Sequence, residues 1–165
     1  MSESQNLISI VIPAFNAEHS ISRLCKELLK TFNKFKIEII VVNDCSPDKT
    51  HEECLKLTKE YPSELTYIKL SKNVGEHNAV MAGIKHSFGD WVIIMDDDFQ
   101  NPPGEALKLL NYATSNKFDV IYGDYRQKKH SFFRNLISKI NDFTANLILK
   151  KPKGLYLSSF KAISR

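Results

Sequence analysis

Residues 91–103, WVIIMDDDFQNPP, decide the fold, because five consecutive apolar residues end abruptly in three aspartates. A continuous apolar run of this length is typical of a strand covered on both faces, as in a parallel sheet. Prolines follow at 102 and 103, and proline suits the first turn of a helix. The stretch therefore predicts a buried strand, a polar loop at its carboxyl end and the start of a helix.

Strand-like and helix-like segments alternate along the rest of the chain. Further short runs rich in Val, Ile and aromatic residues occupy residues 7–13, 37–43, 65–70 and 120–123. Apolar residues recur at helical steps of three and four in residues 21–32, around 54–57, in 75–86 and from 102 onward. This alternation predicts an α/β fold, with a doubly wound, mostly parallel sheet and helices on both faces.

Length and composition fit one folded domain. The chain has 165 residues, of which 42% are hydrophobic and 25% charged. No run approaches the ~18 apolar residues of a membrane-spanning helix, and the first residues do not read as a secretory signal. The three cysteines match no zinc or redox spacing, so we expect reduced thiols without a chemical role, a reactive cysteine being the alternative.

Charge is divided unevenly between the two parts of the chain. Residues 1–124 contain 13 Lys and Arg against 18 Asp and Glu, whereas residues 125–165 contain 10 against 1. In the basic part, cations flank apolar residues at helical spacing between residues 132 and 148, a pattern that suits an anionic membrane surface. The alternative is a helix packed on the domain with solvated lysines. Nucleic-acid binding is disfavoured because the segment contains no recognised module.

The polar residues that follow the strands predict the site, since ligands on such sheets bind beyond the carboxyl ends of the strands. Asp44 follows the second strand and is placed to accept hydrogen bonds from a nucleobase or ribose. Ser46, in the same loop, either contacts the ligand or caps the next helix, as Asp48 also could. No glycine-rich dinucleotide or P-loop motif is present, which argues against a dinucleotide dehydrogenase or a P-loop NTPase.

The acidic segment carries the strongest chemical signal. In an extended segment Asp96, Asp98 and Gln100 would face one side. Three oxygen donors suit Mg²⁺ or Mn²⁺, which take few protein ligands and complete their shells with phosphate oxygens. The alternative is a solvated acidic turn that caps the following helix, although one residue would suffice for that role.

Taken together, these motifs resemble glycosyltransferase family 2, with its GT-A fold. The resemblance rests on residues 12–18 (IPAFNAE), 42–50 (VNDCSPDKT), 73–75 (NVG), 89–90 (GD) and 96–103 (DDDFQNPP). Residues 100–103 and 131–138 (SFFRNLIS) are similar to the branch of the family that uses dolichyl or undecaprenyl phosphate as acceptor. The likeness runs from about residue 8 to the last residue.

The resemblance implies a role for each matched residue. The nucleotide-sugar pocket would comprise Pro13, Phe15, Glu18, Asp44, Ser46, Asn73, Gly75 and Asp96. Asp96, Asp98 and Gln100 would hold the metal, and Arg126, Arg134 and Ser138 would bind the acceptor phosphate or the diphosphate. The residues expected to act in catalysis are Asp98, Asp124 and Arg126.

The chain departs from the family pattern in three places. Cys45 stands where a glycine usually follows the second strand, and the pair of aspartates usual there is Asn43-Asp44. The middle of the acidic triplet, usually small and apolar, is Asp97. Residues 156–161 read YLSSFK. At this place many relatives have Asp-Gly or Cys-Gly, followed by an aromatic residue or Leu and then by Arg. This difference concerns the acceptor side of the site.

The predicted reaction is inverting transfer of a sugar from a nucleotide-diphosphate donor to a polyprenyl phosphate, in cell-envelope glycan synthesis at the inner face of the cell membrane. A phosphate acceptor is already an anion, whereas a hydroxyl acceptor needs a positioned base, for which Asp124 is the plausible candidate. The alternatives are a family 2 enzyme acting on a saccharide hydroxyl and, more distantly, a nucleotide-binding remnant without turnover. A sugar-nucleotidyltransferase would want a glycine-rich loop at residues 13–18, which contain no glycine.

The expected organisation is one domain with two parts. Residues 1–125 would form the nucleotide-sugar-binding core, and residues 126–165 the basic part that faces acceptor and membrane. Relatives are generally longer, so we expect a truncated or partial chain. The donor sugar, the nucleotide base, the exact acceptor and the formation of a homo-oligomer are left open.

Overall fold

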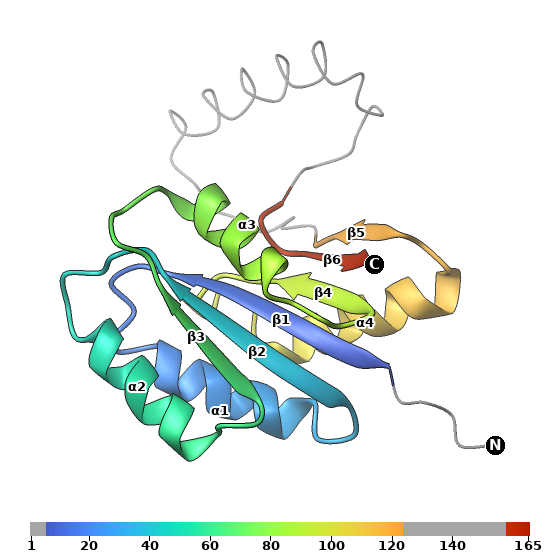
Figure 1. The fold of residues 1–165 in the computed structure, drawn as a ribbon. Helices are drawn as coiled ribbons and strands as arrows, with labels where there is room; N and C mark the ends of the chain where they lie inside the picture. Colours follow the sequence, from blue (N-terminus) through green and yellow to red (C-terminus); the bar gives the residue numbers. More distant parts are fainter. Residues whose placement is uncertain (1–5, 124–157) are drawn as a thin grey trace, which may run out of the picture.

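The computed structural model describes residues 6–123 and 158–165, which form a six-stranded sheet with helices on both faces (Figure 1). The strands are β1 (Leu7–Ala14), β2 (Lys36–Asn43), β3 (Leu65–Lys69), β4 (Trp91–Ile94), β5 (Val120–Tyr122) and β6 (Lys161–Ser164). The helices of the described part are α1 (Ile21–Thr31), α2 (Thr50–Glu60), α3 (Glu76–Lys85) and α4 (Pro103–Asn116).

The order of the strands confirms the predicted doubly wound, mostly parallel sheet. Across the sheet the order is β3-β2-β1-β4-β6-β5. Strands β1 to β4 pair in parallel, and the short β6 lies antiparallel between β4 and β5. The carboxyl ends of the parallel strands therefore share one edge, and the antiparallel β6 brings its first residues to that same edge.

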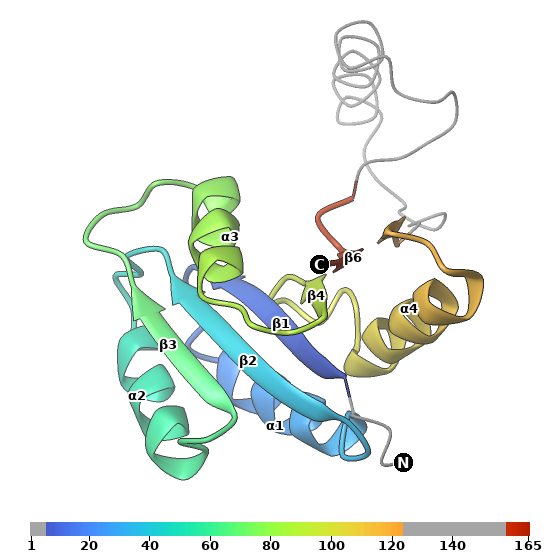
Figure 2. The same cartoon turned by 45° about the vertical axis from the view of Figure 1, so that its right-hand side comes forward.

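Two apolar layers cover the sheet, because successive residues of a strand point to opposite faces. On one face, Ile10 and Ile12 of β1 belong to the core cluster that also includes residues of α1, α2 and α4. On the other face, Val11 packs in a smaller cluster with α3. Figure 2 shows α3 on one side of the sheet and α1 with α2 on the other.

Helix α3 lies unusually close to the sheet because residue 83 is glycine. A Cβ atom at Gly83 would lie 2.4 Å from Cγ1 of Val11 and 3.1 Å from Cγ2 of Val42. Interiors are close-packed, so such a contact would push the helix away from the strands. The close approach positions the amino end of α3 at the carboxyl edge of the sheet.

The cysteine side chains differ sharply in their surroundings. Cys25 and Cys54 are fully buried, and burial raises the pKa of each thiol to about 12. Cys45 is partly exposed, with a φ of 59°, a left-handed conformation that favours glycine. This conformation gives a backbone reason for the glycine that the family resemblance leads one to expect at this position.

We expect Cys45 alone to react with a thiol reagent in the folded protein. The thiolate is the reacting form, and both buried thiols are protonated and shielded at pH 8. Colorimetric titration should find about one reactive thiol in the native chain and all three after denaturation in guanidinium. Rapid reaction of two or three native thiols would contradict this assignment.

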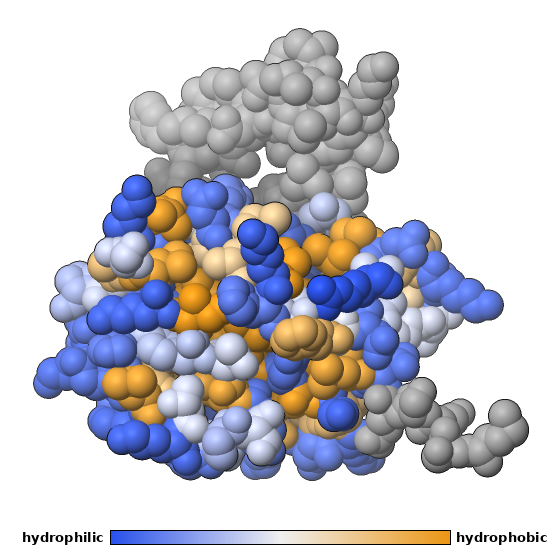
Figure 3. All heavy atoms as spheres, viewed as in Figure 1, coloured by the Kyte–Doolittle hydropathy of each residue, from blue (hydrophilic) through white to orange (hydrophobic). Residues whose placement is uncertain are grey.

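The surface combines polar and apolar residues. On the face seen in Figure 3, hydrophobic residues are interspersed among hydrophilic ones. Large exposed apolar side chains among the described residues include Phe15, Met81, Phe88 and Tyr112. In the described ranges, no helix has the length and hydropathy needed to cross a membrane.

Several expectations concern residues 124–157, which lie outside the described ranges. They are the roles of Asp124, Arg126, Arg134 and Ser138, and the amphipathic pattern between residues 132 and 148. The boundary drawn at residue 125 also falls there. These expectations stay predictions.

Candidate functional site

A pocket opens at the carboxyl edge of the sheet, where the loops after β1, β2, β3 and β4 meet. Its volume is about 380 Å³. The lining residues are Pro13, Ala14, Phe15, Asp44, Asn73, Gly75, Glu76, Asp96, Asp97 and Asp98. Six residues predicted to bind a nucleotide sugar are thus brought together at one cavity, namely Pro13, Phe15, Asp44, Asn73, Gly75 and Asp96. The pocket lies where the sheet topology predicts a ligand site.

Three loops at this edge contain a non-glycine residue with positive φ. Asn16 follows β1, Cys45 follows β2 and Phe99 follows β4, with φ values of 57°, 59° and 59°. Such conformations are uncommon outside glycine and cluster at ligand sites. The loops are therefore held in defined shapes by their surroundings.

Asp44 anchors the loop between β3 and α3. Its side chain is buried, with 3% of the residue exposed, and its Oδ1 and Oδ2 accept hydrogen bonds from the backbone N–H groups of Val74 and Gly75, each 2.8 Å long. Gly75, with a φ of 87°, makes the sharp entry into α3. Because a carboxylate oxygen has further lone pairs, Asp44 can still accept a hydrogen bond from a ligand.

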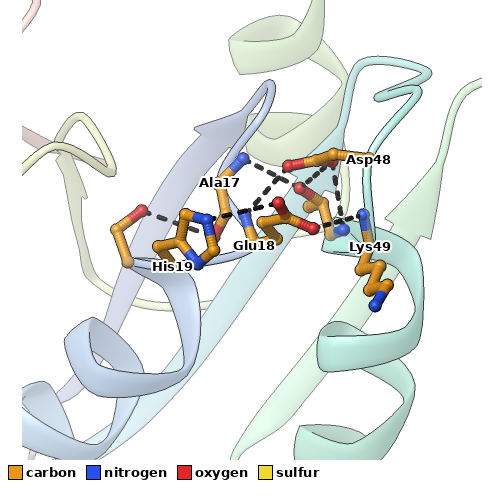
Figure 4. A network of polar contacts seen from close by, with 7 residues as sticks. Ala17, Glu18, His19, Asp48 and Lys49 are labelled. Atoms are coloured by element: carbon orange, nitrogen blue, oxygen red, sulfur yellow. Dashed lines mark hydrogen bonds and ion pairs between the residues drawn. The ribbon is translucent and has the colours of Figure 1, made fainter.

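Glu18 and Ser46 lie outside the pocket lining and join two loops instead. Figure 4 shows the contacts made by Glu18. Its N–H donates to Asp48 Oδ2 (3.1 Å), and its Oε2 accepts from the N–H of Lys49 (3.0 Å). Ser46 Oγ accepts from the N–H of Asn16 at 3.2 Å. Both residues thus hold the loop after β1 against the loop after β2, and their contact with a ligand stays a prediction.

Asp48 makes an Asx turn just before α2, whose N-cap residue is Lys49 and makes no side-chain cap hydrogen bond. Its Oδ1 accepts hydrogen bonds from the N–H and the hydroxyl of Thr50, at 3.1 and 2.6 Å. Burial would raise the pKa of Asp48, but the hydrogen bonds from Thr50 and Glu18 outweigh it and lower the pKa. The prediction that Ser46 or Asp48 caps this helix is therefore wrong, since neither residue occupies the N-cap position.

The acidic segment after β4 is bent, unlike the extended geometry from which the metal site was predicted. Phe99 is left-handed, and Gln100 turns back so that its N–H and Nε2 donate to Asp98, at 2.9 and 2.5 Å. All three aspartates line the pocket, including Asp97, which alternation placed on the opposite side, whereas Gln100 is absent from the lining. Gln100 therefore contacts the pocket indirectly, through its hydrogen bonds to Asp98.

Asp97 is the most perturbed group of the site. Burial raises the pKa of its carboxyl to about 6, and the neighbouring carboxylates of Asp98 and Asp96 raise it further, while a hydrogen bond from the N–H of Phe15 opposes the shift. Its Oδ2 is buried without a hydrogen-bond partner among the described residues. Negative charge is therefore concentrated here, and none of the described residues that line the pocket is a Lys or Arg.

This arrangement fits a divalent cation that is shared with a ligand. Among the described residues, no group of three or more His, Cys, Asp and Glu side chains is arranged to hold a metal ion by itself. Mg²⁺ and Mn²⁺ in nucleotide sites need one or two carboxylates, with phosphate oxygens and water completing the shell. The crowded carboxylates of Asp96 and Asp98 satisfy that requirement.

Asp97→Asn should stabilise the cation-free protein. Because folding raises the pKa of Asp97 from 3.8 to about 6, ionisation of this side chain weakens the folded state as pH rises through that window. The free energy of unfolding of the variant should exceed that of the native chain by about 1–2 kcal/mol above pH 6, after allowance for partial solvent screening.

The difference should shrink as pH falls and vanish below about pH 3, where Asp97 is neutral in both the folded and the unfolded state. Urea unfolding in the presence of a chelator, from about pH 2.5 to 7.5, measures it. Asp119→Asn, which changes an exposed carboxylate, should show little change over the same range. A constant difference between the native chain and Asp97→Asn would contradict the assignment.

The last strand contributes residues that the sequence analysis did not assign to the site. Ser159, just before β6, donates a hydrogen bond from its hydroxyl to Asp96 Oδ2 at 2.8 Å. Lys161, the first residue of β6, pairs with Ile94 of β4 and Tyr122 of β5. In the sequence, these residues are marked only by the departure from the family pattern at residues 156–161. That departure does not predict that the segment joins the sheet beside β4.

Solved structures share this fold. A mannosyltransferase from Pyrobaculum calidifontis, in complex with GDP-Man and Mn²⁺, superimposes with a TM-score of 0.69 over 99% of this chain and 46% of its own, at 16% identity. Glucosyl-3-phosphoglycerate synthase from Mycobacterium tuberculosis, in complex with Mn²⁺, UDP and phosphoglyceric acid, gives 0.71 over 96% and 56%, at 20% identity. The fold is the GT-A fold of glycosyltransferases.

The sequence comparisons define the family. The model of "Glycosyl transferase family 2" matches residues 9–165, so the chain belongs to this family. Undecaprenyl-phosphate 4-deoxy-4-formamido-L-arabinose transferase of Pectobacterium atrosepticum is 33% identical over 160 residues, which are 96% of this chain and 47% of that protein. The enzyme of the same name from Salmonella choleraesuis is 33% identical over 165 residues, with the same coverage. The chain thus spans about half the length of these curated relatives.

Proposed function

We propose that this chain contains the donor-binding and catalytic core of an inverting glycosyltransferase that transfers a sugar from a nucleotide diphosphate to a polyprenyl phosphate. The observation that carries the proposal is the pocket lined by Asp44, Asp96, Asp97 and Asp98 in a chain 33% identical to undecaprenyl-phosphate sugar transferases. The relatives' names support a lipid-phosphate acceptor, and the role that we propose for the transfer is envelope glycan synthesis.

The nucleotide end of the donor occupies the side of the pocket formed by β1 and β2. Pro13 and Phe15 offer apolar surface to a base, and Phe15 is 47% exposed at the pocket. Asp44 accepts a hydrogen bond from the base or the ribose with its remaining lone pairs. Asn73 and Gly75 complete this wall, while Glu18 and Ser46 keep its loops together.

The diphosphate end lies toward the acidic segment. Asp96 and Asp98 would hold Mg²⁺ or Mn²⁺, with Gln100 as the further oxygen donor that the sequence predicts, and the bound ion would neutralise the charge that develops on the leaving diphosphate. Ser159 fixes the orientation of Asp96 through its hydrogen bond. The amide of Gln100 fixes Asp98 in the same way.

The acceptor side needs little proton transfer. The phosphate oxygen of a polyprenyl phosphate is an anion near pH 7, so it can attack the anomeric carbon without a strong base. Arg126, Arg134 and Ser138 bind this phosphate, and Asp124 serves as base only if the acceptor is a hydroxyl. Residues 126–165, with their cations and apolar residues, face the inner surface of the membrane, and residues 1–125 form the donor-binding core.

Parallel transfer assays with two kinds of acceptor test the proposal. The 165-residue chain is incubated with Mn²⁺ and radiolabelled nucleotide sugars, with either undecaprenyl phosphate in detergent or soluble oligosaccharides. We expect label in the lipid fraction with undecaprenyl phosphate. Label only in oligosaccharide would overturn the lipid acceptor in favour of a hydroxyl acceptor, and donor binding without any turnover would identify a non-catalytic remnant.

A further inference from the structure

A second cavity lies beside the donor pocket, between α3 and β6. Its volume is about 240 Å³. The residues that line it are Glu76, His77, Val80, Ile94, Tyr122, Ser158, Ser159 and Lys161. The cavity is therefore lined by the first turns of α3, by the last residues of β4 and β5, and by the first residue of β6 with the two serines before it.

The two cavities adjoin at the acidic segment. Glu76 lines both of them. Ser159, in the wall of the second cavity, donates its hydroxyl hydrogen bond to Asp96 in the wall of the first. A group held in the second cavity thus lies next to the position proposed for the diphosphate and the sugar.

Apart from Glu76, whose carboxylate only accepts hydrogen bonds, the polar side chains that line the second cavity carry donors suited to an anion. Among the described residues that line either cavity, Lys161 is the single Lys or Arg. Its Nζ lies 5.9 Å from the ring centroid of Tyr122, and it forms no ion pair with another described residue. Ser158 is buried and accepts a hydrogen bond from the N–H of Phe160 with its Oγ, so its O–H remains available to donate.

We propose that this second cavity binds the phosphate monoester of the acceptor, with Lys161 as its charged ligand and Ser158 as a neutral donor. This inference rests on the proposed function and adds residues to the acceptor side. One phosphate oxygen then forms a bond to the anomeric carbon while the bond from that carbon to the donor diphosphate breaks. The electron pair of the broken bond leaves with the diphosphate, and no proton is transferred.

Lys161→Met tests the charge while keeping most of the aliphatic stem. The 165-residue chain is titrated by calorimetry with farnesyl phosphate, with farnesol and with inorganic phosphate. We expect Lys161→Met to weaken farnesyl phosphate binding about 10- to 100-fold, the range for loss of a charge-assisted hydrogen bond. Farnesol binding should be unchanged, and Lys161→Arg should retain farnesyl phosphate binding within about threefold because the charge is kept.

Lys69→Met is the matched control. Lys69 ends β3 at the same edge of the sheet but lines neither cavity. We expect this variant to bind farnesyl phosphate like the native chain. Binding of UDP or GDP with Mn²⁺, measured in parallel, should be unchanged by Lys161→Met, because the donor pocket is intact.

Three results would overturn the inference. They are the absence of farnesyl phosphate binding to the native chain, unchanged binding in Lys161→Met, and inorganic phosphate binding as tight as that of farnesyl phosphate. Failure of the proposed function would give a different set of results in the binding titration and the transfer assay. In that case farnesyl phosphate binding still depends on Lys161, but radiolabelled sugar passes only to a saccharide hydroxyl.

Discussion

Asp98→Ala should lower the rate of sugar transfer about 1000-fold at saturating donor, acceptor and Mn²⁺. Asp98 lines the donor pocket and is held by two hydrogen bonds from Gln100. Its carboxylate has no role in the apolar core, so the variant should fold normally. The loss corresponds to about 4 kcal/mol of transition-state stabilisation, which is reasonable for a ligand of the ion that balances a leaving diphosphate.

Single-turnover kinetics with radiolabelled donor measure this loss separately from binding. Glu105→Ala is the control, since Glu105 is exposed on α4, pairs with Lys108 and lies outside the donor pocket. That variant should transfer sugar at the native rate. If Asp98→Ala kept more than a tenth of the native rate, Asp98 would not be a ligand of a required metal.

Asp44→Ala should cost about 3 kcal/mol of stability and weaken nucleotide binding at least 100-fold. The substitution removes the acceptor for the N–H groups of Val74 and Gly75, both 2.8 Å from the carboxylate. Hydrogen bonds to a charged group contribute roughly 1.5–3 kcal/mol each, and the N–H of Gly75 would keep only its longer hydrogen bond to Asn73 Oδ1, at 3.2 Å. The loop before α3 would also lose its fixed position at the pocket wall.

Urea unfolding and calorimetric titration with UDP or GDP in Mn²⁺ measure the two effects. Asp119→Ala removes an exposed carboxylate that lines neither cavity and accepts one long hydrogen bond, from Ser164 at 3.3 Å. This variant should change stability by less than about 0.5 kcal/mol. Unchanged stability of Asp44→Ala would show that the loop before α3 is held by other contacts. Unchanged nucleotide binding would remove Asp44 from the donor site.

Five of the six strands could be predicted because their apolar runs are local signals. Strands β1 and β2 are almost wholly buried toward their carboxyl ends, and an uninterrupted apolar run records such burial directly. The loops after these strands were predicted as the site by topology alone. Most of the predicted nucleotide-binding residues do line one pocket, since parallel strands deliver their carboxyl ends to a common edge.

Strand β6 could not be predicted because its signal is not local. It has four residues, and only Ala162 is buried among them. Its place in the sheet depends on pairing with Trp91–Ile94 and Val120–Tyr122, which a short sequence pattern does not encode. The orientation of Asp97 was missed because β4 ends at Ile94 and the chain bends from Asp97 onward, so the alternation of an extended segment does not apply there.

The position of β6 also determines the order in which the sheet can be completed during synthesis. Strand β4 meets its antiparallel partner only after residues 161–164 have left the ribosome, since Trp91 pairs with Ser164. Until then one side of β4 presents unpaired backbone groups, which are a template for wrong pairing with other chains. The nascent protein therefore passes through a half-built sheet whose open edge is closed only by a segment made well after β4, and contacts of such long range slow folding.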